Sequence, residues 1–300
     1  HCGISILLND LGDDYFASLF NEEIGAVIQV RHKDTEDVLS ILREHQLMQH
    51  VHVIGTLNDT QRIEFYFRHK KIIDESRVDL QQIWSETSFN IQKLRDNPIC
   101  AKQEFAKIAN EGDNGLFAEV NFDLNTFAVP MLQKNIKPKV AILREQGVNG
   151  HIEMAAAFTH AGFQAVDVHM SDIISGRVTL GEFIGLAACG GFSYGDVLGA
   201  GRGWAKTIRY NTRAYEEFAA FFLNPNTFTL GVCNGCQMLA HLTEIIPGTS
   251  HWPVFVRNQS EQFEARLVMV EVMNSPSIFF NGMQGSKIPI VVSHGEGLTR

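Results

Sequence analysis

The sequence lacks a long apolar run and an excess of basic residues. No stretch of about 18 consecutive apolar residues occurs in it, so we expect no membrane-spanning helix. The formal net charge is −9, whereas non-specific binding of nucleic acid needs a basic surface. The composition therefore predicts a protein that binds neither membranes nor nucleic acid.

Cysteine is also scarce. The chain contains 5 cysteines in 300 residues, namely Cys2, Cys100, Cys189, Cys233 and Cys236. An odd number of scattered cysteines is not typical of a disulfide framework, so we expect reduced thiols and a cytoplasmic protein. The first residues, HCGISILLND, include neither an initiator Met nor a basic leader segment. Together with the abrupt end at SHGEGLTR, this favours a piece of a longer chain.

The periodicity of apolar residues divides the chain into three regions. Residues 1–83 alternate short predicted strands and helices, which indicates a small α+β domain. Within it we expect a helix at 14–25 (DYFASLFNEEIG) and a strand at 26–31 (AVIQVR). Residues 84–135 contain two predicted helices followed by an irregular stretch with prolines, and we interpret them as a linker.

From residue 136 to residue 300, apolar runs alternate with segments of helical periodicity. The predicted strands are KVAILRE, QAVDVHM, FIGLAACGGF and FTLGVC. This alternation predicts the α/β class, a mostly parallel sheet with helices on both faces. Ligands of such sheets bind beyond the carboxyl ends of the strands, so the loops REQGVNG, GGFSYGD and VCNGCQ should share one rim.

Cys233 lies where the strand FTLGV gives way to a helix. A residue at such a sharp turn projects its side chain from the rim, as nucleophiles do in strand–turn–helix elbows, and the small neighbours Gly231 and Gly235 permit it. The helix N-terminus favours a thiolate, and the next backbone N–H, from Asn234, can stabilise an oxyanion. Cys236 follows about one helical turn later and can pack as a small apolar residue.

Other interpretations of the two cysteines remain open. A C-x-x-C at a helix start is also typical of a dithiol redox pair. A zinc site needs roughly four ligands, and no second C-x-x-C is present, so we expect no metal. The two residues can also be merely structural. The loop GGFSYGD favours acyl transfer, because its glycines leave backbone N–H groups free to face a ligand.

Several motifs together resemble one enzyme family. The segments GGFSYGDVLGAG, GVCNGCQ and WPVFVRNQSEQFEARLVMVEV are similar to the glutaminase domain of the large, single-chain formylglycinamidine ribonucleotide synthases, which are class I glutamine amidotransferases. KPKVAILREQGVNGHIEMAAAF is similar to the start of that domain, and the segments LFNEEIGAVIQV and WSETSFNIQKLRDNP to the end of the preceding synthetase region and its connection. The resemblance covers nearly the whole chain.

The resemblance implies an activity and a set of residues. Glutamine would be hydrolysed through a glutamyl thioester, and the ammonia would pass to the synthetase region of the same monomeric enzyme in purine biosynthesis. There ATP would activate formylglycinamide ribonucleotide, giving the amidine, ADP and phosphate. The residues implied are the nucleophile Cys233, Ser193 and Asn234 for the oxyanion hole, and Gln237, Asn258, Ser260, Phe263 and Arg266 for glutamine.

The general base is less simple to assign. The residues alone indicate His294 and Glu296, which follow the apolar run IPIVV. In the family, however, the triad histidine and glutamate belong to a Pro-His-Pro-Glu stretch further along the domain, so we expect them beyond Arg300 and keep His294 and Glu296 as the fallback pair. The resemblance likewise places ATP and Mg²⁺ outside residues 1–300, and we expect little glutaminase activity from these residues alone.

Overall fold

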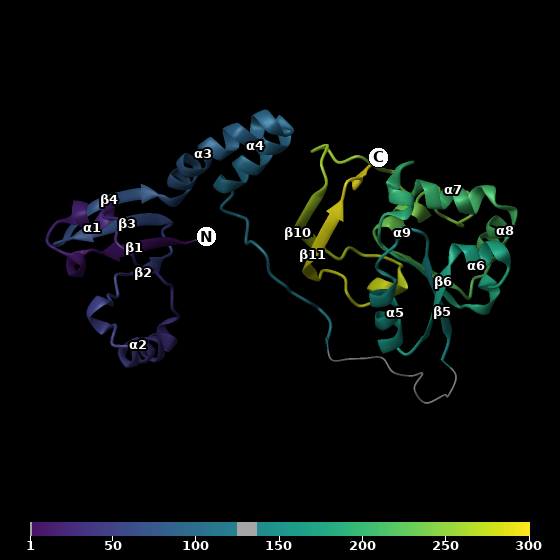
Figure 1. Ribbon diagram of the computed structural model, residues 1–300, viewed down its shortest axis with the longest axis horizontal. Helices are drawn as coiled ribbons and strands as arrows, with labels where there is room; N and C mark the ends of the chain where they lie inside the picture. Colours follow the sequence, from purple (N-terminus) through teal and green to yellow (C-terminus); the bar gives the residue numbers. More distant parts are fainter. Residues whose placement is uncertain (1, 125–136) are drawn as a thin grey trace. The chain divides into compact units, whose positions relative to one another are not determined.

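The computed structural model describes residues 2–124 and 137–300. The chain divides into two units, His1–Asn114 and Gly115–Arg300 (Figure 1). Residues 125–136, which comprise the end of the predicted linker and the first residue of the predicted α/β region, lie outside the described residues. None of the helices in the described ranges combines the length and the apolar composition of a membrane span.

The first unit contains a four-stranded sheet of order β2-β1-β3-β4. β1 pairs in parallel with β3, and the other two pairings are antiparallel. The strands are β1 (Gly3–Leu7), β2 (Gly55–Asn58), β3 (Arg62–Phe67) and β4 (Lys70–Ser76), and the helices are α1 (Tyr15–Phe20), α2 (Thr35–Glu44), α3 (Arg77–Arg95) and α4 (Pro98–Ala106).

Two sequence expectations for this unit are wrong. Residues 26–31 do not form a strand, and the helix expected at 14–25 is confined to α1. Both edges of β1 are already paired, by β2 and by β3. In the structure the apolar run at 26–31 pairs with none of the described strands, and Val27 is 82% exposed.

Helices α3 and α4 cover much of the range predicted as a linker and fall inside the first unit. The Ser76 hydroxyl caps α3 by accepting a hydrogen bond from the Asp79 N–H, which satisfies a free donor of the first turn. α4 begins at Pro98, whose fixed φ suits a first helical position, and the Asn97 side chain caps it. The ring of Phe89 stacks on that of Phe105, at a centroid distance of 4.4 Å, and joins the two helices.

The second unit is built on four parallel strands of order β6-β5-β7-β8. This confirms the expected α/β class. The strands of the sheet are β5 (Lys139–Arg144), β6 (Gln164–His169), β7 (Gly185–Ala188) and β8 (Phe228–Gly231), and the helices around it are α5 (His151–His160), α6 (Met170–Ser175), α7 (Arg202–Tyr210), α8 (Thr212–Leu223) and α9 (Asn234–Leu239).

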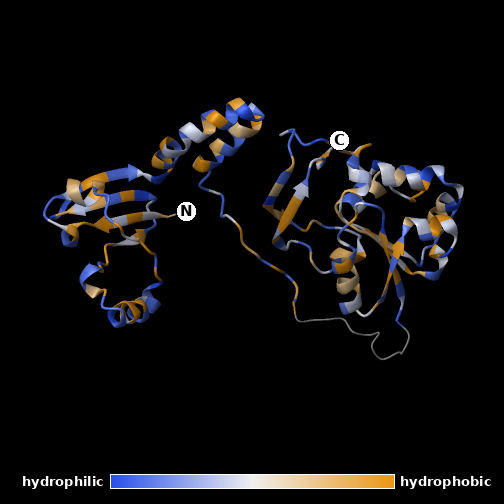
Figure 2. Ribbon diagram, in the orientation of Figure 1, coloured by the Kyte–Doolittle hydropathy of each residue, from blue (hydrophilic) through white to orange (hydrophobic). Residues whose placement is uncertain are grey.

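Alternate residues of β5 face two separate cores. Val140 and Ile142 pack in a cluster with Phe158 of α5, whereas Ala141 and Leu143 pack against the other face with residues of α6 to α9. Successive side chains of a strand point to opposite faces, so a strand covered on both sides is apolar throughout. These four residues are fully buried, and Figure 2 colours the centre of the sheet hydrophobic.

Outside this sheet, β10 (Glu264–Glu271) pairs antiparallel with β11 (Lys287–His294), and β9 (Phe255–Val256) with β12 (Leu298–Thr299). The segment around Glu119 forms a bridge to Lys287 of β11. β11 ends beside the carboxyl edge of the parallel sheet, since the Cys233 thiol lies 3.9 Å from the Ser293 carbonyl oxygen. The second unit therefore brings a separate strand pair to the predicted rim.

Candidate active site

Cys233 occupies a strained turn between β8 and α9. Its φ is 51° and its ψ is −115°, a conformation that costs a residue with a side chain about 1–3 kcal/mol. The close approach of α9 to β7 imposes this turn, because a Cβ added to Gly235 would lie 2.1 Å from the Ala188 carbonyl oxygen. The Cys233 side chain is exposed, so the elbow expected from the sequence is present.

The Cys233 thiol opens into a pocket of about 250 Å³. Its walls come from the loop after β7, from α9, and from the segments around β9, β10 and β11. They comprise Gly191, Phe192, Asp196, Ala200, Cys233, Gln237, Arg257, Phe263, Ser293, His294, Gly295 and Glu296. Of the residues predicted from the sequence, Cys233, Gln237, Phe263, His294 and Glu296 are thereby brought together.

The GGFSYGD loop lies directly against Cys233. A Cβ added to Gly190 would be 3.2 Å from the Cys233 Cβ, so the loop backbone packs closely beside this residue. The N–H of Phe192 donates to the Gly147 carbonyl, and the N–H of Asn149 donates to the Gly190 carbonyl. Gly191 has φ 143°, and a Cβ there would lie 2.6 Å from the Gly147 oxygen, so only glycine fits.

Two backbone N–H groups are available as oxyanion donors. Within the described residues, neither Gly191 nor Asn234 has a hydrogen-bond acceptor for its N–H. The Ser193 N–H, by contrast, donates to Asn234 Oδ1 over 3.1 Å. Ser193 was predicted as a donor, but in this structure its N–H is occupied, and its side chain is only 1% exposed. Gly191 and Asn234 thus form the better donor pair.

Asn234 links the loop to the helix through its side chain. It is fully buried, and its Nδ2 donates to Asp196 Oδ1 at 3.0 Å and to Gln237 Oε1 at 3.3 Å. Gln237 Nε2 in turn donates to the Glu296 carbonyl oxygen over 2.7 Å. Burial raises the pKa of Asp196, although the hydrogen bond from Asn234 opposes this.

The predicted glutamine-recognition residues divide into different roles. Asn258 is buried, and its Nδ2 donates to the carbonyl oxygens of Gln262 and His294. Ser260 hydrogen-bonds Glu264 at 2.6 Å, and Arg266 pairs with the same carboxylate. Ser260, Arg266 and Asn258 do not line the pocket, whereas Phe263 does.

His294 and Glu296 both face the pocket but do not form a dyad. Nδ1 of His294 lies 3.0 Å from Asn258 Oδ1, and the same oxygen accepts the Gly297 N–H. Among the described contacts, the imidazole ring of His294 therefore hydrogen-bonds Asn258 and not Glu296. The structure supplies an orienting partner for this imidazole that the sequence did not indicate.

Several pocket residues were not singled out from the sequence, among them Gly191, Asp196 and Arg257. Gly191 and Asp196 lie within the GGFSYGD motif, whose glycine content was the available signal. Arg257 carried no such signal, and its guanidinium donates to the Glu261 carbonyl oxygen over 2.8 Å. A cation and two carboxylates, those of Asp196 and Glu296, therefore line the same pocket, which suits a zwitterionic amino acid.

The other cysteines differ from Cys233. Burial raises the pKa of the Cys236 thiol, with a further contribution from Cys233. Burial raises the pKa of Cys189 to about 12. Neither thiol is therefore a ready thiolate. Among residues 2–124 and 137–300, no group of three or more His, Cys, Asp or Glu side chains could hold a metal ion.

Two comparisons relate this chain to known proteins. The sequence profile of the CobB/CobQ-like glutamine amidotransferase domain matches residues 137–300. The solved structure of PurLQS from Thermotoga maritima is similar at 25% sequence identity over 55% of this chain and 70% of that chain, with a TM-score of 0.44. The profile match spans more than half of the 300 residues and includes the whole parallel sheet and its rim. The chain belongs to the family of CobB/CobQ-like glutamine amidotransferase domains.

Proposed function

We propose that this chain is the glutamine-hydrolysing region of a formylglycinamidine ribonucleotide synthase. The observation that carries the proposal is the exposed Cys233 thiol at a positive-φ turn, beside the free N–H groups of Gly191 and Asn234. Family membership supports glutamine as the amide that is cleaved. The motif resemblance of the sequence supports the purine-pathway ligase as the enzyme that receives the ammonia.

In the proposed reaction the Cys233 thiolate attacks the side-chain amide carbon of glutamine. The carbonyl oxygen becomes an oxyanion and accepts hydrogen bonds from Gly191 and Asn234. The tetrahedral adduct then expels the amide nitrogen, which takes up a proton and leaves as ammonia. Water attacks the resulting glutamyl thioester, releases glutamate and restores the thiol.

The base that serves Cys233 is proposed from the resemblance. The family's Pro-His-Pro-Glu element does not occur in the 300 residues, and we assign the base to that element. His294 is the fallback, because it lines the pocket and its ring is oriented by Asn258. A neutral imidazole whose Nδ1–H donates to Asn258 would leave Nε2 free to accept a proton.

The ligation step would take place outside residues 1–300. It consumes formylglycinamide ribonucleotide, ammonia and ATP, and it yields formylglycinamidine ribonucleotide, ADP and phosphate. The proposal places the ATP and Mg²⁺ of this step in the synthetase region, outside residues 1–300. The steps proposed at Cys233 use neither ATP nor Mg²⁺.

The test uses the intact protein and two nitrogen donors. Formylglycinamidine ribonucleotide is measured with ATP and either glutamine or ammonium chloride, in wild type, Cys233→Ala and the matched control Cys236→Ala. We expect Cys233→Ala to abolish the glutamine-dependent reaction and to retain the ammonia-dependent one, and Cys236→Ala to retain both. Equal loss of both reactions in Cys233→Ala would contradict the assignment of Cys233 to glutamine hydrolysis.

The same variants examine the redox alternative. A dithiol pair would form a reversible disulfide between Cys233 and Cys236, and its function would need both sulfurs. Loss of glutamine use in both cysteine variants, together with this disulfide under mild oxidation, would favour the redox reading. The unequal exposure of the two thiols instead favours Cys233 as a single nucleophile.

A further inference from the structure

Tyr194 lies in the middle of the GGFSYGD loop in a strained conformation. Its φ is 54° and its ψ is 29°, a left-handed conformation that is uncommon for a bulky residue. Its backbone N–H donates to the Gln146 carbonyl over 2.9 Å. Because such strain persists only where the surroundings hold it, the contacts of the Tyr194 side chain need an explanation.

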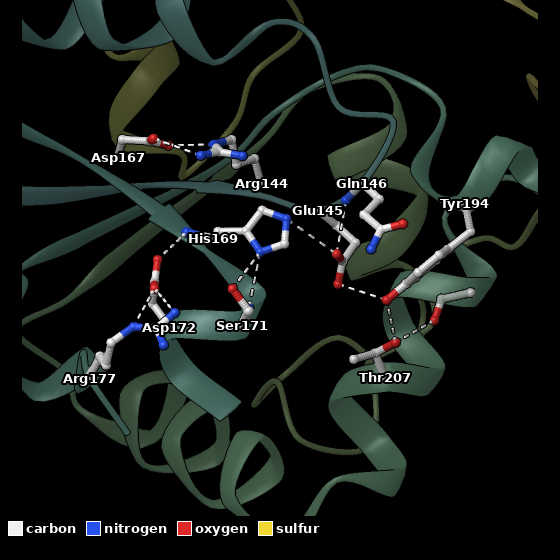
Figure 3. A network of polar contacts seen from close by, with 11 residues as sticks. Arg144, Glu145, Gln146, Asp167, His169, Ser171, Asp172, Arg177, Tyr194 and Thr207 are labelled. Atoms are coloured by element: carbon white, nitrogen blue, oxygen red, sulfur yellow. Dashed lines mark hydrogen bonds and ion pairs between the residues drawn. The ribbon is translucent and has the colours of Figure 1, made fainter. Parts of the chain in front are cut away.

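The Tyr194 side chain reaches a buried carboxylate at the end of β5. Its hydroxyl donates to Glu145 Oε2 over 2.8 Å and lies 3.0 Å from Thr207 Oγ1 on α7 (Figure 3). Burial raises the pKa of the Tyr194 phenol, and the neighbouring Glu145 raises it as well, so the hydroxyl remains a donor. The loop is therefore tied through one hydroxyl to a strand and to a helix.

Glu145 is 4% exposed, and the mechanism proposed at Cys233 does not use it. A carboxylate removed from water is unfavourable unless hydrogen bonds and charges compensate for the lost hydration. Oε1 accepts the Gln146 N–H at 2.9 Å and lies 3.6 Å from Nε2 of His169. The remaining oxygen is the one that faces Tyr194.

His169 completes the surroundings of Glu145. Its Nδ1 accepts the Ser171 backbone N–H over 3.1 Å, as a cap of α6. An accepting Nδ1 carries no proton, so the proton of the neutral ring is on Nε2, the nitrogen that faces Glu145. The carboxyl ends of β5, β6 and β7 thus meet in one polar network, as Figure 3 shows.

From this geometry we infer that Tyr194, held by Glu145, is a positioning residue for the oxyanion hole. The inference rests on the proposed function. Gly191 lies three residues before Tyr194 in the same loop, and the loop is fixed to residues 146–149 by its backbone hydrogen bonds. The Tyr194–Glu145 bond fixes the far end of this loop, and so sets where the Gly191 N–H points.

The inference is tested by the rate at which a chloroketone analogue of glutamine inactivates the intact protein. The Cys233 thiolate adds to the ketone carbon, giving an oxyanion in the hole. Sulfur then displaces chloride from the neighbouring carbon, and the carbonyl re-forms as the first C–S bond breaks, which leaves a thioether. We compare wild type, Tyr194→Phe and the matched control Tyr210→Phe, whose ring is 78% exposed. Iodoacetamide, which alkylates a thiol without an oxyanion, reports the thiol itself.

For Tyr194→Phe we expect the maximal inactivation rate to fall by about tenfold to a hundredfold, since small displacements of a donor have effects of this size. The half-saturating concentration, the iodoacetamide rate and the melting temperature should stay close to those of wild type and of Tyr210→Phe. Glu145→Gln, which keeps the shape but weakens the acceptor, should give an intermediate rate.

Two other results would overturn the positioning role of Tyr194. An unchanged inactivation rate in Tyr194→Phe overturns the positioning role, and so does an equal fall with iodoacetamide, which would place the effect on the thiol. If Tyr194→Phe does not fold, Glu145→Gln decides the matter by the same two rates. Failure of the chloroketone to modify Cys233 in wild type contradicts the proposed function itself.

Discussion

The backbone N–H of Ser193 donates to the side-chain oxygen of Asn234 over 3.1 Å. This hydrogen bond joins the loop after β7 to the helix that follows Cys233, across 41 residues of sequence. Asn234 also donates to Asp196 and Gln237. One buried amide therefore joins the two segments that carry the proposed oxyanion donors.

Replacement of the Asn234 side chain should lower the stability of the protein. In Asn234→Ala, the Ser193 N–H would lose its acceptor and the Gln237 side-chain oxygen would lose its donor. A buried polar group left unpaired costs about 1–3 kcal/mol. We expect the free energy of unfolding in urea to fall by that amount. The exposed Asn226 provides the control, and Asn226→Ala should change stability by less than about 0.5 kcal/mol. Equal, small effects of both substitutions would show that the link is unimportant.

A side chain at Gly191 should disable the oxyanion hole. In Gly191→Ala the new methyl group would lie 2.6 Å from the Gly147 oxygen, so the loop must move away from Cys233. Loss of one oxyanion donor lowers kcat by about 10²–10³, and we expect a fall of this order in glutamine-dependent turnover of the intact protein. Gly181→Ala, where a Cβ meets nothing within 4 Å, should turn over like wild type. Unchanged turnover in Gly191→Ala would remove Gly191 from the hole.

Substitution of His294 distinguishes the two possible bases. Loss of a general base lowers turnover by about 10²–10⁴-fold. Because we assign the base to another histidine, His294→Gln should lower glutamine-dependent turnover by less than about tenfold, through its contact with Asn258. The exposed His251 gives the control variant His251→Gln. A loss of the larger size in His294→Gln alone would make His294 the base.

The stability of the second unit should decrease in mild acid because of His241. The pKa of His241 is lowered from 6.5, mainly by burial and also by the nearby charges of Arg202 and Arg209. Glu296 opposes this shift only in part. A histidine whose folded pKa is depressed binds its proton more readily when unfolded. Its contribution to stability is therefore complete above about pH 6.5 and is lost as the pH falls below that value.

Melting temperatures of the intact protein at pH 7.5 and pH 5.5 test whether His241 makes the protein less stable in acid. The decrease on acidification should be smaller in His241→Gln than in wild type. The exposed His251 again serves as the control, and His251→Gln should retain the full decrease. If His241→Gln loses as much stability in acid as wild type, another group is responsible.

The sheet of the second unit was predictable because the apolar pattern of each strand lies within a few consecutive residues. β5 is apolar at its four inner positions, Val140 to Leu143, and the alternation of such runs with helices indicates the parallel topology. The elbow at Cys233 follows from a strand end and two glycines. The strand expected at 26–31 is absent because strand formation requires pairing with a neighbouring strand, and an apolar pattern does not report whether that pairing occurs.

The site was predictable only in part for a related reason. Cys233 and the glycine loop have motifs, whereas the bonds that position them join residues far apart in sequence. Tyr194 and Glu145 are separated by 49 residues, and Asn258 and His294 by 36. No periodicity signals such pairs. Asn258 was assigned to glutamine, but its buried amide holds the segment of His294 in place.

The most direct test of the account is the position of the covalent adduct formed by a diazo-ketone analogue of glutamine. The intact protein is labelled, digested and mapped by mass spectrometry, with and without excess glutamine. We expect one adduct on Cys233, suppressed by glutamine, with Cys236 and Cys189 unmodified. An adduct on Cys236, or labelling of Cys233 that glutamine does not suppress, would contradict the claim that Cys233 is the nucleophile of a glutamine site.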